Sequence, residues 1–312
     1  MKALLALLSV CCLVMVTEAS ALASVPTPGI TASPALEQLS LKQGQSTLSF
    51  TTQVTNNTNV AIAVDIHAQD FTSLNQNGGV NFLGSNDNPH GLASSMHIGT
   101  KQLKLEPGQS QTLNFTITDA DALSTGGHYG AIVYRILGPD LTPYNTVTVN
   151  QAVTTLVFLT TASQGTQELK LASPVVGRYA STFPTSFEAV FANTGNTQTA
   201  ARGLIQILDH AKKVVSQGVI NADSGLILPG SERLFAVNMR PLTTAYLWPG
   251  VYTAKISYHY LGQTTFSVED ETFLYVGWQQ IVLALFALLL LLSGVGILLK
   301  KTWLKRRLRF GS

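Results

Sequence analysis

Cysteine is almost absent from this 312-residue chain: Cys11 and Cys12 are the only two, and both lie near its start. Around them a short basic start, an apolar run from Ala3 to Val16 and the small-x-small sequence of residues 21–23 are typical of a secretory signal peptide, predicted over residues 1–23. Cleavage before Ser24 would leave a chain without cysteine. Disulfides, thiol nucleophiles and cysteine-ligated metal sites are then excluded from the exported part.

Charged residues are also scarce, at 12% of the chain, and none lies between Gln279 and Leu299. A bilayer core needs about 20 apolar residues in helical form, because no backbone group can stay unpaired in hydrocarbon. We therefore predict a transmembrane helix over 278–299, followed by a basic tail over 300–312. The six Lys and Arg residues of that tail indicate its cytoplasmic side. The predicted location is the plasma membrane, single-pass, with the N-terminal domains extracellular.

The positive net charge of the whole chain comes from that tail. Of 19 basic residues, one lies in the signal and six in the tail, which leaves 12; of 17 acidic residues, one lies in the signal, which leaves 16. The segment 24–278 thus has a net charge of −4, and nucleic-acid binding is not indicated. Its length suggests two domains of ordinary size.

The exported segment has no convincing amphipathic helix and consists instead of two copies of one plan. Three landmarks recur in the same order: an Asn-rich turn (56–59 and 193–196), a Pro-Gly turn (107–108 and 229–230) and a Gly-x-Tyr-x-Ala strand (127–131 and 250–254). The step from Pro107 to Tyr129 is 22 residues, and from Pro229 to Tyr252 it is 23. We interpret this as a tandem duplication in which both tyrosines pack in a core.

Short alternating strands between Gly, Pro and Asn turns are typical of an immunoglobulin-like sandwich. The predicted fold is all-β: two tandem immunoglobulin-like β-sandwich domains, 24–164 and 165–277, followed by one C-terminal transmembrane α-helix. The first domain carries an Asn/Gly-rich insertion over 72–100. Long irregular insertions are often binding loops. Our candidates for ligand contact there are Phe71, Phe82, Asn86 and Asp87.

Signatures of catalysis are missing. The chain has no HExxH, no Gly-x-Ser-x-Gly, no phosphate-binding glycine loop and no dinucleotide fingerprint. Asp65, His67 and Asp70, with His90 and His97, have no metal-site spacing and are interpreted as surface polar residues. We therefore predict a protein that is not an enzyme and has no catalytic residue, cofactor or metal.

The ordered motifs resemble a known family. They are Ser33-Pro34, the Gly-Gly-x-Tyr-Gly-Ala-Ile of 126–132, the Leu-Pro-Gly-Ser-x-Arg-x-Phe of 228–235 and the Pro-Gly-x-Tyr of 249–252, before a transmembrane helix and basic tail. This arrangement is similar to the WxL-interacting proteins of Gram-positive bacterial surfaces. The resemblance implies peptidoglycan binding by the first domain and contacts with WxL-type or other surface proteins by the second.

The leading hypothesis is thus a non-enzymatic, membrane-anchored surface scaffold that binds peptidoglycan or partner surface proteins through loops or an exposed sheet edge. The alternative is an assembly factor for exported subunits that resembles the pilus chaperones, which also pair two sandwiches. Such chaperones use basic residues in a cleft, and the candidates here are Arg135, Arg178 and Arg202.

Overall fold

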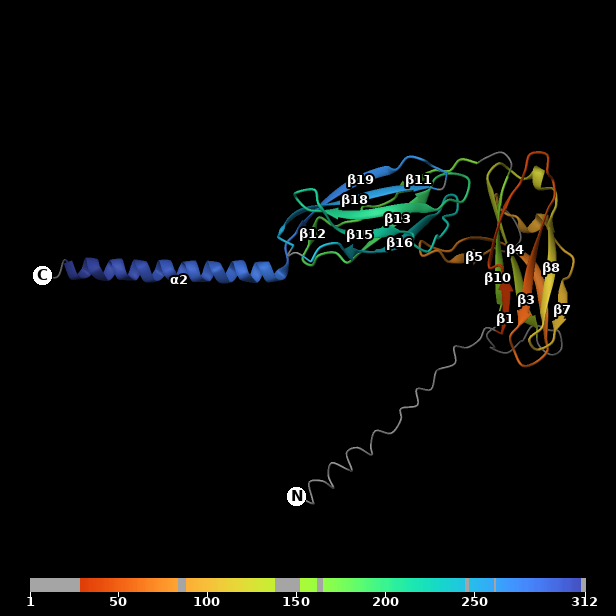
Figure 1. Ribbon diagram of the computed structural model, residues 1–312, viewed down its shortest axis with the longest axis horizontal. Coiled ribbons are helices and arrows are strands. Elements are labelled where there is room, and N and C mark those ends of the chain that lie inside the picture. The colour runs from red at the N-terminus through yellow and green to blue at the C-terminus, as the bar shows by residue number, and fades with distance from the viewer. Residues whose placement is uncertain are drawn as a thin grey trace, which may run out of the picture.

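The computed structural model describes residues 29–83, 88–137, 152–161, 165–244, 247–260 and 262–309 (Figure 1). The predicted signal peptide with its two cysteines, the candidates Asn86 and Asp87, and residues 310–312 lie outside these ranges. So do the side chains of residues 298–299 and 301–309. The described chain forms two β-sandwiches and one long C-terminal helix.

The first sandwich packs a smaller sheet against a larger one. The smaller sheet has the strand order β1 (Ile30–Ser33), β3 (Leu48–Asn56), β8 (Ser110–Ile117), β6 (Met96–Ile98). The larger has the order β2 (Leu36–Ser40), β10 (Ala152–Thr160), β9 (Gly127–Leu137), β4 (Ile62–Ser73), β5 (Val80–Phe82), with β7 (Gln102–Leu105) also paired to β4. Strand β2 runs parallel to β10, and two 3-10 turns complete the domain, η1 (Ala93–Ser95) and η2 (Ala120–Ala122).

The second sandwich repeats this plan. Its smaller sheet has the order β11 (Leu169–Leu171), β13 (Ser186–Asn193), β16 (Glu232–Asn238). Its larger sheet has the order β12 (Tyr179–Ala180), β19 (Ser267–Tyr275), β18 (Gly250–Tyr260), β14 (Ala201–Leu208), β15 (Val214–Ile220), β17 (Arg240–Pro241). Here β12 is parallel to β19, as β2 is to β10. The predicted class of two tandem immunoglobulin-like sandwiches is confirmed. The limits 24–164 and 165–277 stay a prediction, because residues at both edges of the first domain are not described.

Alternating side chains build each core. In β3, Phe50, Thr52 and Val54 are buried, while the alternate residues 49, 51 and 53 are exposed. This is the period of a strand with one face in water. Strand β9 differs, because eight consecutive residues from Gly127 to Tyr134 are buried. A strand buried on both faces must be covered twice. One face of β9 meets the sandwich core, and the other faces the second domain.

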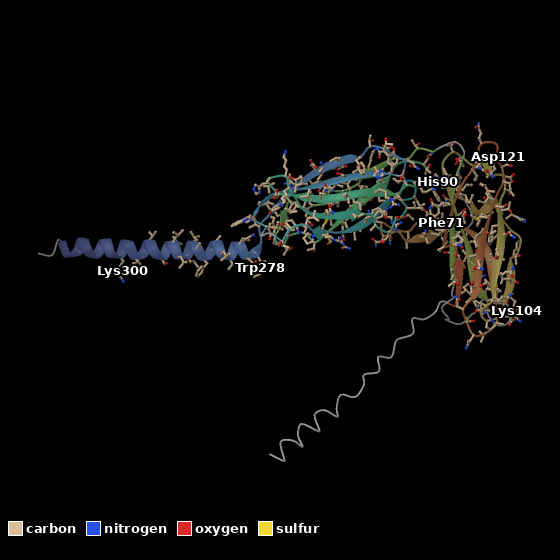
Figure 2. The ribbon with its side chains drawn as sticks, in the orientation of Figure 1. Phe71, His90, Lys104, Asp121, Trp278 and Lys300 are labelled. Carbon is tan, nitrogen blue, oxygen red and sulfur yellow. The ribbon has the colours of Figure 1, made fainter. Side chains whose placement is uncertain are left out.

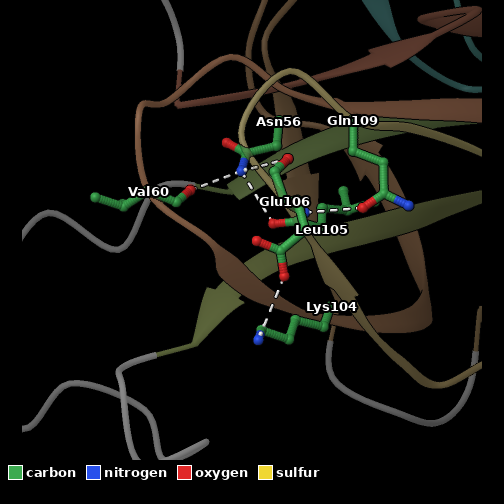
Figure 3. A network of polar contacts seen from close by, with 6 residues as sticks. All are labelled: Asn56, Val60, Lys104, Leu105, Glu106 and Gln109. Carbon is green, nitrogen blue, oxygen red and sulfur yellow. Dashed lines mark hydrogen bonds and ion pairs between the residues drawn. The ribbon is translucent and has the colours of Figure 1, made fainter.

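The duplicated turns are fastened by one buried asparagine in each domain. Asn56 donates from Nδ2 to the backbone oxygens of Val60, Leu105 and Glu106, at 2.8, 3.1 and 3.1 Å (Figure 3). Asn193 donates in the same way to Thr197 and Ile227, at 2.8 and 2.9 Å.

The backbones of these asparagines match as well. The carbonyl of Asn56 accepts from Gly108 N and that of Asn193 from Gly230 N, each at 2.9 Å. In both domains the Asn-rich turn is therefore tied to the Pro-Gly turn, and the repeat seen in the sequence is a repeat of hydrogen bonds.

The third landmark is displaced by one residue between the domains. Tyr252 lies in the second core and donates to the backbone oxygen of Trp248, four residues back, at 2.8 Å. In the first domain His128 makes that contact, from Nε2 to the oxygen of Ser124, at 2.9 Å. Tyr129 is buried, as predicted, but points to the opposite face of the sheet. A shift of one residue in a strand turns every side chain over. The residue that takes the position of Tyr252 therefore lies 21 residues after Pro107, whereas Tyr252 lies 23 residues after Pro229.

Helix α2 (Trp278–Arg309) leaves the far end of the second sandwich and continues through the basic segment (Figure 1). Its part Trp278–Ile297 has a mean hydropathy of 2.5 and is not buried against the rest of the described chain. Length and composition thus make it a helix that can cross a membrane, and it is the one such helix in the described residues.

Candidate functional site

A second apolar cluster lies between the two sandwiches. Phe71, Tyr129 and Phe158 are buried to 4% exposure or less, and their ring centroids lie 5.4–6.2 Å apart. Phe158 packs edge-on against the other two rings, which are tilted to each other. They project from β4, β9 and β10, on the face of the larger sheet turned away from its own core. Leu226 and Leu228 of the second domain pack against them. Figure 2 shows Phe71 at the junction of the domains.

Hydrogen bonds join the domains on both sides of this cluster. On one side Asn196 O accepts from Gly127 N at 2.9 Å, and Gln198 Oε1 accepts from the Tyr129 hydroxyl at 3.2 Å. On the other, the turn between β4 and β5 reaches across, and Gln76 O accepts from Leu234 N at 2.7 Å. The first part of the predicted insertion therefore connects the two sandwiches through a hydrogen bond. Together these contacts favour one fixed arrangement of the two domains.

Two cavities flank this junction. The first has a volume of about 230 Å³ and is mainly apolar, with walls from both domains. The second, of about 650 Å³, is more polar. Gln38 and Leu226 line both cavities, so the two are neighbours along one cleft. Gln38 belongs to β2, the outermost strand of its sheet, whose Leu36 is 38% exposed and also lines the first cavity.

The cation of this cleft is Arg233, at the edge of the first cavity. Its Nη1 donates to Leu226 O at 2.7 Å, and its guanidinium lies 5.5 Å from the centre of the Phe235 ring. Burial lowers its pKa from the usual value of an arginine. No carboxylate within ion-pair distance of it is found in the described part of the chain. Arg233 is therefore a positioned, half-buried cation with donors to spare.

Two glycines leave room for that guanidinium. A Cβ added to Gly78 would lie 2.4 Å from the guanidinium carbon of Arg233, and one added to Gly225 would lie 2.6 Å from it. Gly78 also has a φ of +82°, which side-chain-bearing residues rarely adopt. Each domain thus supplies one glycine to hold an arginine that the sequence analysis did not select. The only sequence signal was its place in the Leu-Pro-Gly-Ser-x-Arg-x-Phe motif.

The predicted contact residues have different environments. Phe71 is 1% exposed and belongs to the interdomain cluster, although it also lines the first cavity. Phe82 pairs with it across β4 and β5 and is 37% exposed. Asn86 and Asp87 lie outside the described residues. A shared ligand surface for these four residues stays a prediction.

The three arginines predicted for a cleft lie elsewhere. Arg135 pairs with Asp65 at 3.1 Å on the outer face of the first domain. Arg178 is at the far end of the second sandwich, where its carbonyl accepts from Leu274 N at 2.9 Å. Arg202 is exposed on β14. None of the three lines either cavity described above.

The acidic and histidine residues of the first domain have structural contacts. Asp70 Oδ1 accepts from the backbone nitrogens of Leu92 and Ala93 at 2.8 and 2.7 Å, which holds η1 in place. Asp65 Oδ2 lies 3.2 Å from His67 Nδ1. Among the residues that the structure describes, no three His, Cys, Asp or Glu side chains gather as a metal would require.

Burial of Tyr129 gives a pH-dependent prediction. Desolvation raises the pKa of its phenol above the ordinary 10.0, partly offset by the contact with Gln198. The folded chain therefore keeps a proton that the unfolded chain releases, so this contribution to stability is complete below pH 10 and is lost as the pH rises beyond it. Melting of the full chain between about pH 8 and 11 should show a shallower alkaline decline for Tyr129→Phe than for the wild type.

The control for that experiment is Gln198→Ala, which keeps the phenol and removes its partner. It should retain the alkaline decline, because desolvation is the larger cause. An unchanged pH dependence in Tyr129→Phe would contradict the prediction.

Comparison with known proteins gives likeness of fold. Neither a protein-family model nor a curated protein matches the chain by sequence. Among solved structures, the class 5 fimbriae chaperone CfaA is 11% identical, with 79% of this chain and 99% of that one covered and a TM-score of 0.43. The E. coli chaperone DraB is 12% identical, with 78% and 96% covered and a TM-score of 0.36. The CsuC–CsuE chaperone–tip subunit complex of Acinetobacter baumannii is 8% identical, with 79% of this chain and 99% of that one covered and a TM-score of 0.35.

The strand order, and not these likenesses, defines the class of protein. The chain is a mostly-β protein of two immunoglobulin-like domains plus one C-terminal apolar helix. The resemblance to WxL-interacting proteins is not matched by a family model and stays a prediction.

Proposed function

We propose that this protein is a non-enzymatic cell-surface scaffold that binds an extended segment of an exported partner protein in the cleft between its sandwiches. Helix α2 would anchor it in the plasma membrane, with both sandwiches outside and the basic tail in the cytoplasm. The observation that carries the proposal is Arg233, held between two domains at the edge of an apolar cavity without an acidic partner in the described chain.

The surroundings of Arg233 fit a polypeptide better than a sugar or nucleotide. The adjoining cavity is bounded by Leu36, Phe158 and Leu228, which would accept apolar side chains. Strand β2 ends its sheet beside that cavity, so one side of its backbone can pair with an added strand. An extended chain alternates its side chains. It could place apolar groups in the cavity while its backbone runs along β2.

The guanidinium supplies the polar contact for such a segment. It can donate to a carbonyl or, in charge-assisted form, to a carboxylate. Hydrogen bonds to a charged group contribute about 1.5–3 kcal/mol. We therefore expect Arg233→Gln to weaken partner binding by roughly 10- to 150-fold.

The test is photo-crosslinking in intact cells of the source organism, with a photoreactive residue at position 38 of the full chain. The expected product is an adduct with one defined exported protein, and Arg233→Gln should remove most of it. Arg240→Gln is the matched control, because Arg240 is an exposed arginine of the same domain. A photoreactive residue at Val60, 57% exposed in the β3–β4 turn, controls for nonspecific capture.

Two outcomes would overturn the proposal. One is capture at position 38 no stronger than at position 60. The other is an adduct with wall fragments that a muramidase releases, which would favour the peptidoglycan binding that the family resemblance implies.

The second candidate function is assembly of exported subunits, and the open edge of β2 beside the cleft favours it. A scaffold keeps its partner, whereas a chaperone passes it on. Pulse-chase labelling of the position-38 adduct separates the two, since a chaperone adduct would decline while labelled subunit accumulates elsewhere on the cell.

A further inference from the structure

Large apolar side chains surround the point where α2 leaves the second sandwich. Four of them, Tyr179, Trp248, Val251 and Trp278, form what we call the collar, and they are 79, 71, 58 and 61% exposed. Figure 2 places Trp278 at the start of the helix. Exposed tryptophan and tyrosine are costly in water but favourable where apolar and polar surroundings meet.

The pairing of the strands brings the collar together. Tyr179 is the partner of Leu274 across β12 and β19, and Leu274 is the partner of Val251 across β19 and β18. These residues therefore form one row on one face of the sheet. Trp248 follows Leu247, whose carbonyl accepts from Gln280 Nε2 in the first turn of α2 at 3.2 Å. Each member of the collar is thus next to the beginning of the helix in space.

The junction between sandwich and helix is too short for free movement. Strand β19 ends at Tyr275 and α2 begins at Trp278, so two residues connect them. Both are hydrogen-bonded: Val276 N donates to Ala180 O at 3.0 Å, and Gly277 N donates to Gln280 Oε1 at 2.5 Å. Because only two residues separate the second sandwich from α2, the sandwich must lie next to any bilayer that α2 crosses.

Basic side chains occupy the same end. Leu208, the last residue of β14, pairs with Thr253 near the start of β18, so the β14–β15 turn points the same way as the collar. That turn carries Lys212 and Lys213, and Arg178 precedes Tyr179; all three are exposed. The acid of the turn, Asp209, accepts from backbone nitrogens within the turn itself.

We propose that the collar end of the second sandwich lies in the headgroup layer of the leaflet that α2 enters. The partner that this end binds is the surface of an anionic bilayer. Aromatic rings would lie at the interface, and the three cations would lie beside lipid phosphates. The eleven residues of β18 span the sandwich, about 35 Å at 3.3 Å per residue. The interdomain cleft would be held at roughly that height. This inference rests on the membrane-anchor part of the proposed function and not on what the cleft binds.

The test uses spin labels on single cysteines in the full chain, in vesicles of phosphatidylcholine and phosphatidylglycerol, with Cys11 and Cys12 replaced by serine. Labels at positions 179 and 248 are expected to be severalfold less accessible to a water-soluble nickel chelate than a label at position 268. Val268 is the matched control: it is 51% exposed, in the same strand as Leu274 and on the same face, but near the opposite end of the sandwich.

The collar proposal fails if positions 179 and 248 are as open to the chelate as position 268. A label at Leu290, in the middle of the span, tests the anchor separately. If that label is open to the chelate, α2 does not cross the bilayer, and the membrane part of the proposed function fails as well.

In vesicles of phosphatidylcholine alone, protection at 179 and 248 should fall if the cations contribute. The double variant Lys212→Gln with Lys213→Gln should reproduce that fall in the anionic vesicles. If protection is unchanged both in the neutral vesicles and in the lysine double variant, the proposal that anionic lipid is recognised is wrong.

Discussion

Replacing Asn56 by alanine is expected to lower the free energy of unfolding of the first sandwich by about 3 kcal/mol. The side chain is completely buried, and its two Nδ2 protons serve three backbone carbonyls (Figure 3). Its Oδ1 accepts from Thr58 N at 2.9 Å. Alanine removes these partners and brings no water in their place. Calorimetry of the detergent-solubilised full chain should show the transition lowered by on the order of 10 °C.

The neighbouring Asn57 provides the control. Its side chain is exposed and donates once, to Thr31 Oγ1 at 3.2 Å. Asn57→Ala should therefore change the free energy of unfolding by less than about 0.5 kcal/mol. The duplicated network predicts that Asn193→Ala will weaken the second sandwich in the same way, since Asn193 is 1% exposed. Equal effects of Asn56→Ala and Asn57→Ala would contradict the prediction.

Ending the chain after Gly277 is expected to move nearly all of the protein from the membrane fraction into the medium. This truncation removes Trp278–Ile297, the one span-length apolar helix of the described chain. Each Leu, Ile or Phe at the centre of a helix favours membrane insertion by about 0.5 kcal/mol. No other described helix has the length and composition to collect this free energy, so none can replace α2 as the span. Fractionation of cells that produce each form, with immunodetection of the second sandwich, measures the effect.

A chain ended after Arg309 is the matched control, because it keeps the whole of α2, and it should stay in the membrane. A high-salt wash should release any of the shorter form that adheres to lipid through the collar. Membrane retention that resists salt and alkaline carbonate would contradict the prediction. Protease added to intact cells should degrade the sandwiches of the full chain and spare the tail, if the predicted orientation holds.

The alternation of apolar side chains and the turn residues determined the fold class without any tertiary information. Short-range chemistry explains why. Asn and Gly take the backbone conformations of turns, Pro-Gly begins a turn, and a strand with one wet face alternates. The same turn residues, recurring in one order at similar spacing, indicated that the plan is duplicated. The long apolar helix was equally predictable, since about 20 uncharged apolar residues have few other stable environments.

Residue environments that depend on register were not predictable. Tyr129 and Tyr252 occupy matching motifs, yet one residue of difference sends Tyr129 out of its own core and into the junction between domains. His128, which no motif singled out, takes the position that Tyr252 has in the other domain. Local sequence cannot show this, because the face of a strand is set by its pairing with other strands.

The candidate site shows the same division. Among the twelve basic residues of segment 24–278, composition gave no reason to prefer Arg233 over Arg135, Arg178 or Arg202. What distinguishes it is the space left by Gly78 and Gly225, which come from different domains. The sequence by itself determined the sandwiches, their duplication and the long apolar helix, since these follow from the pattern of neighbouring residues. Only the tertiary structure decided the cleft, its cation and the collar, because each is made by residues that are distant in the chain.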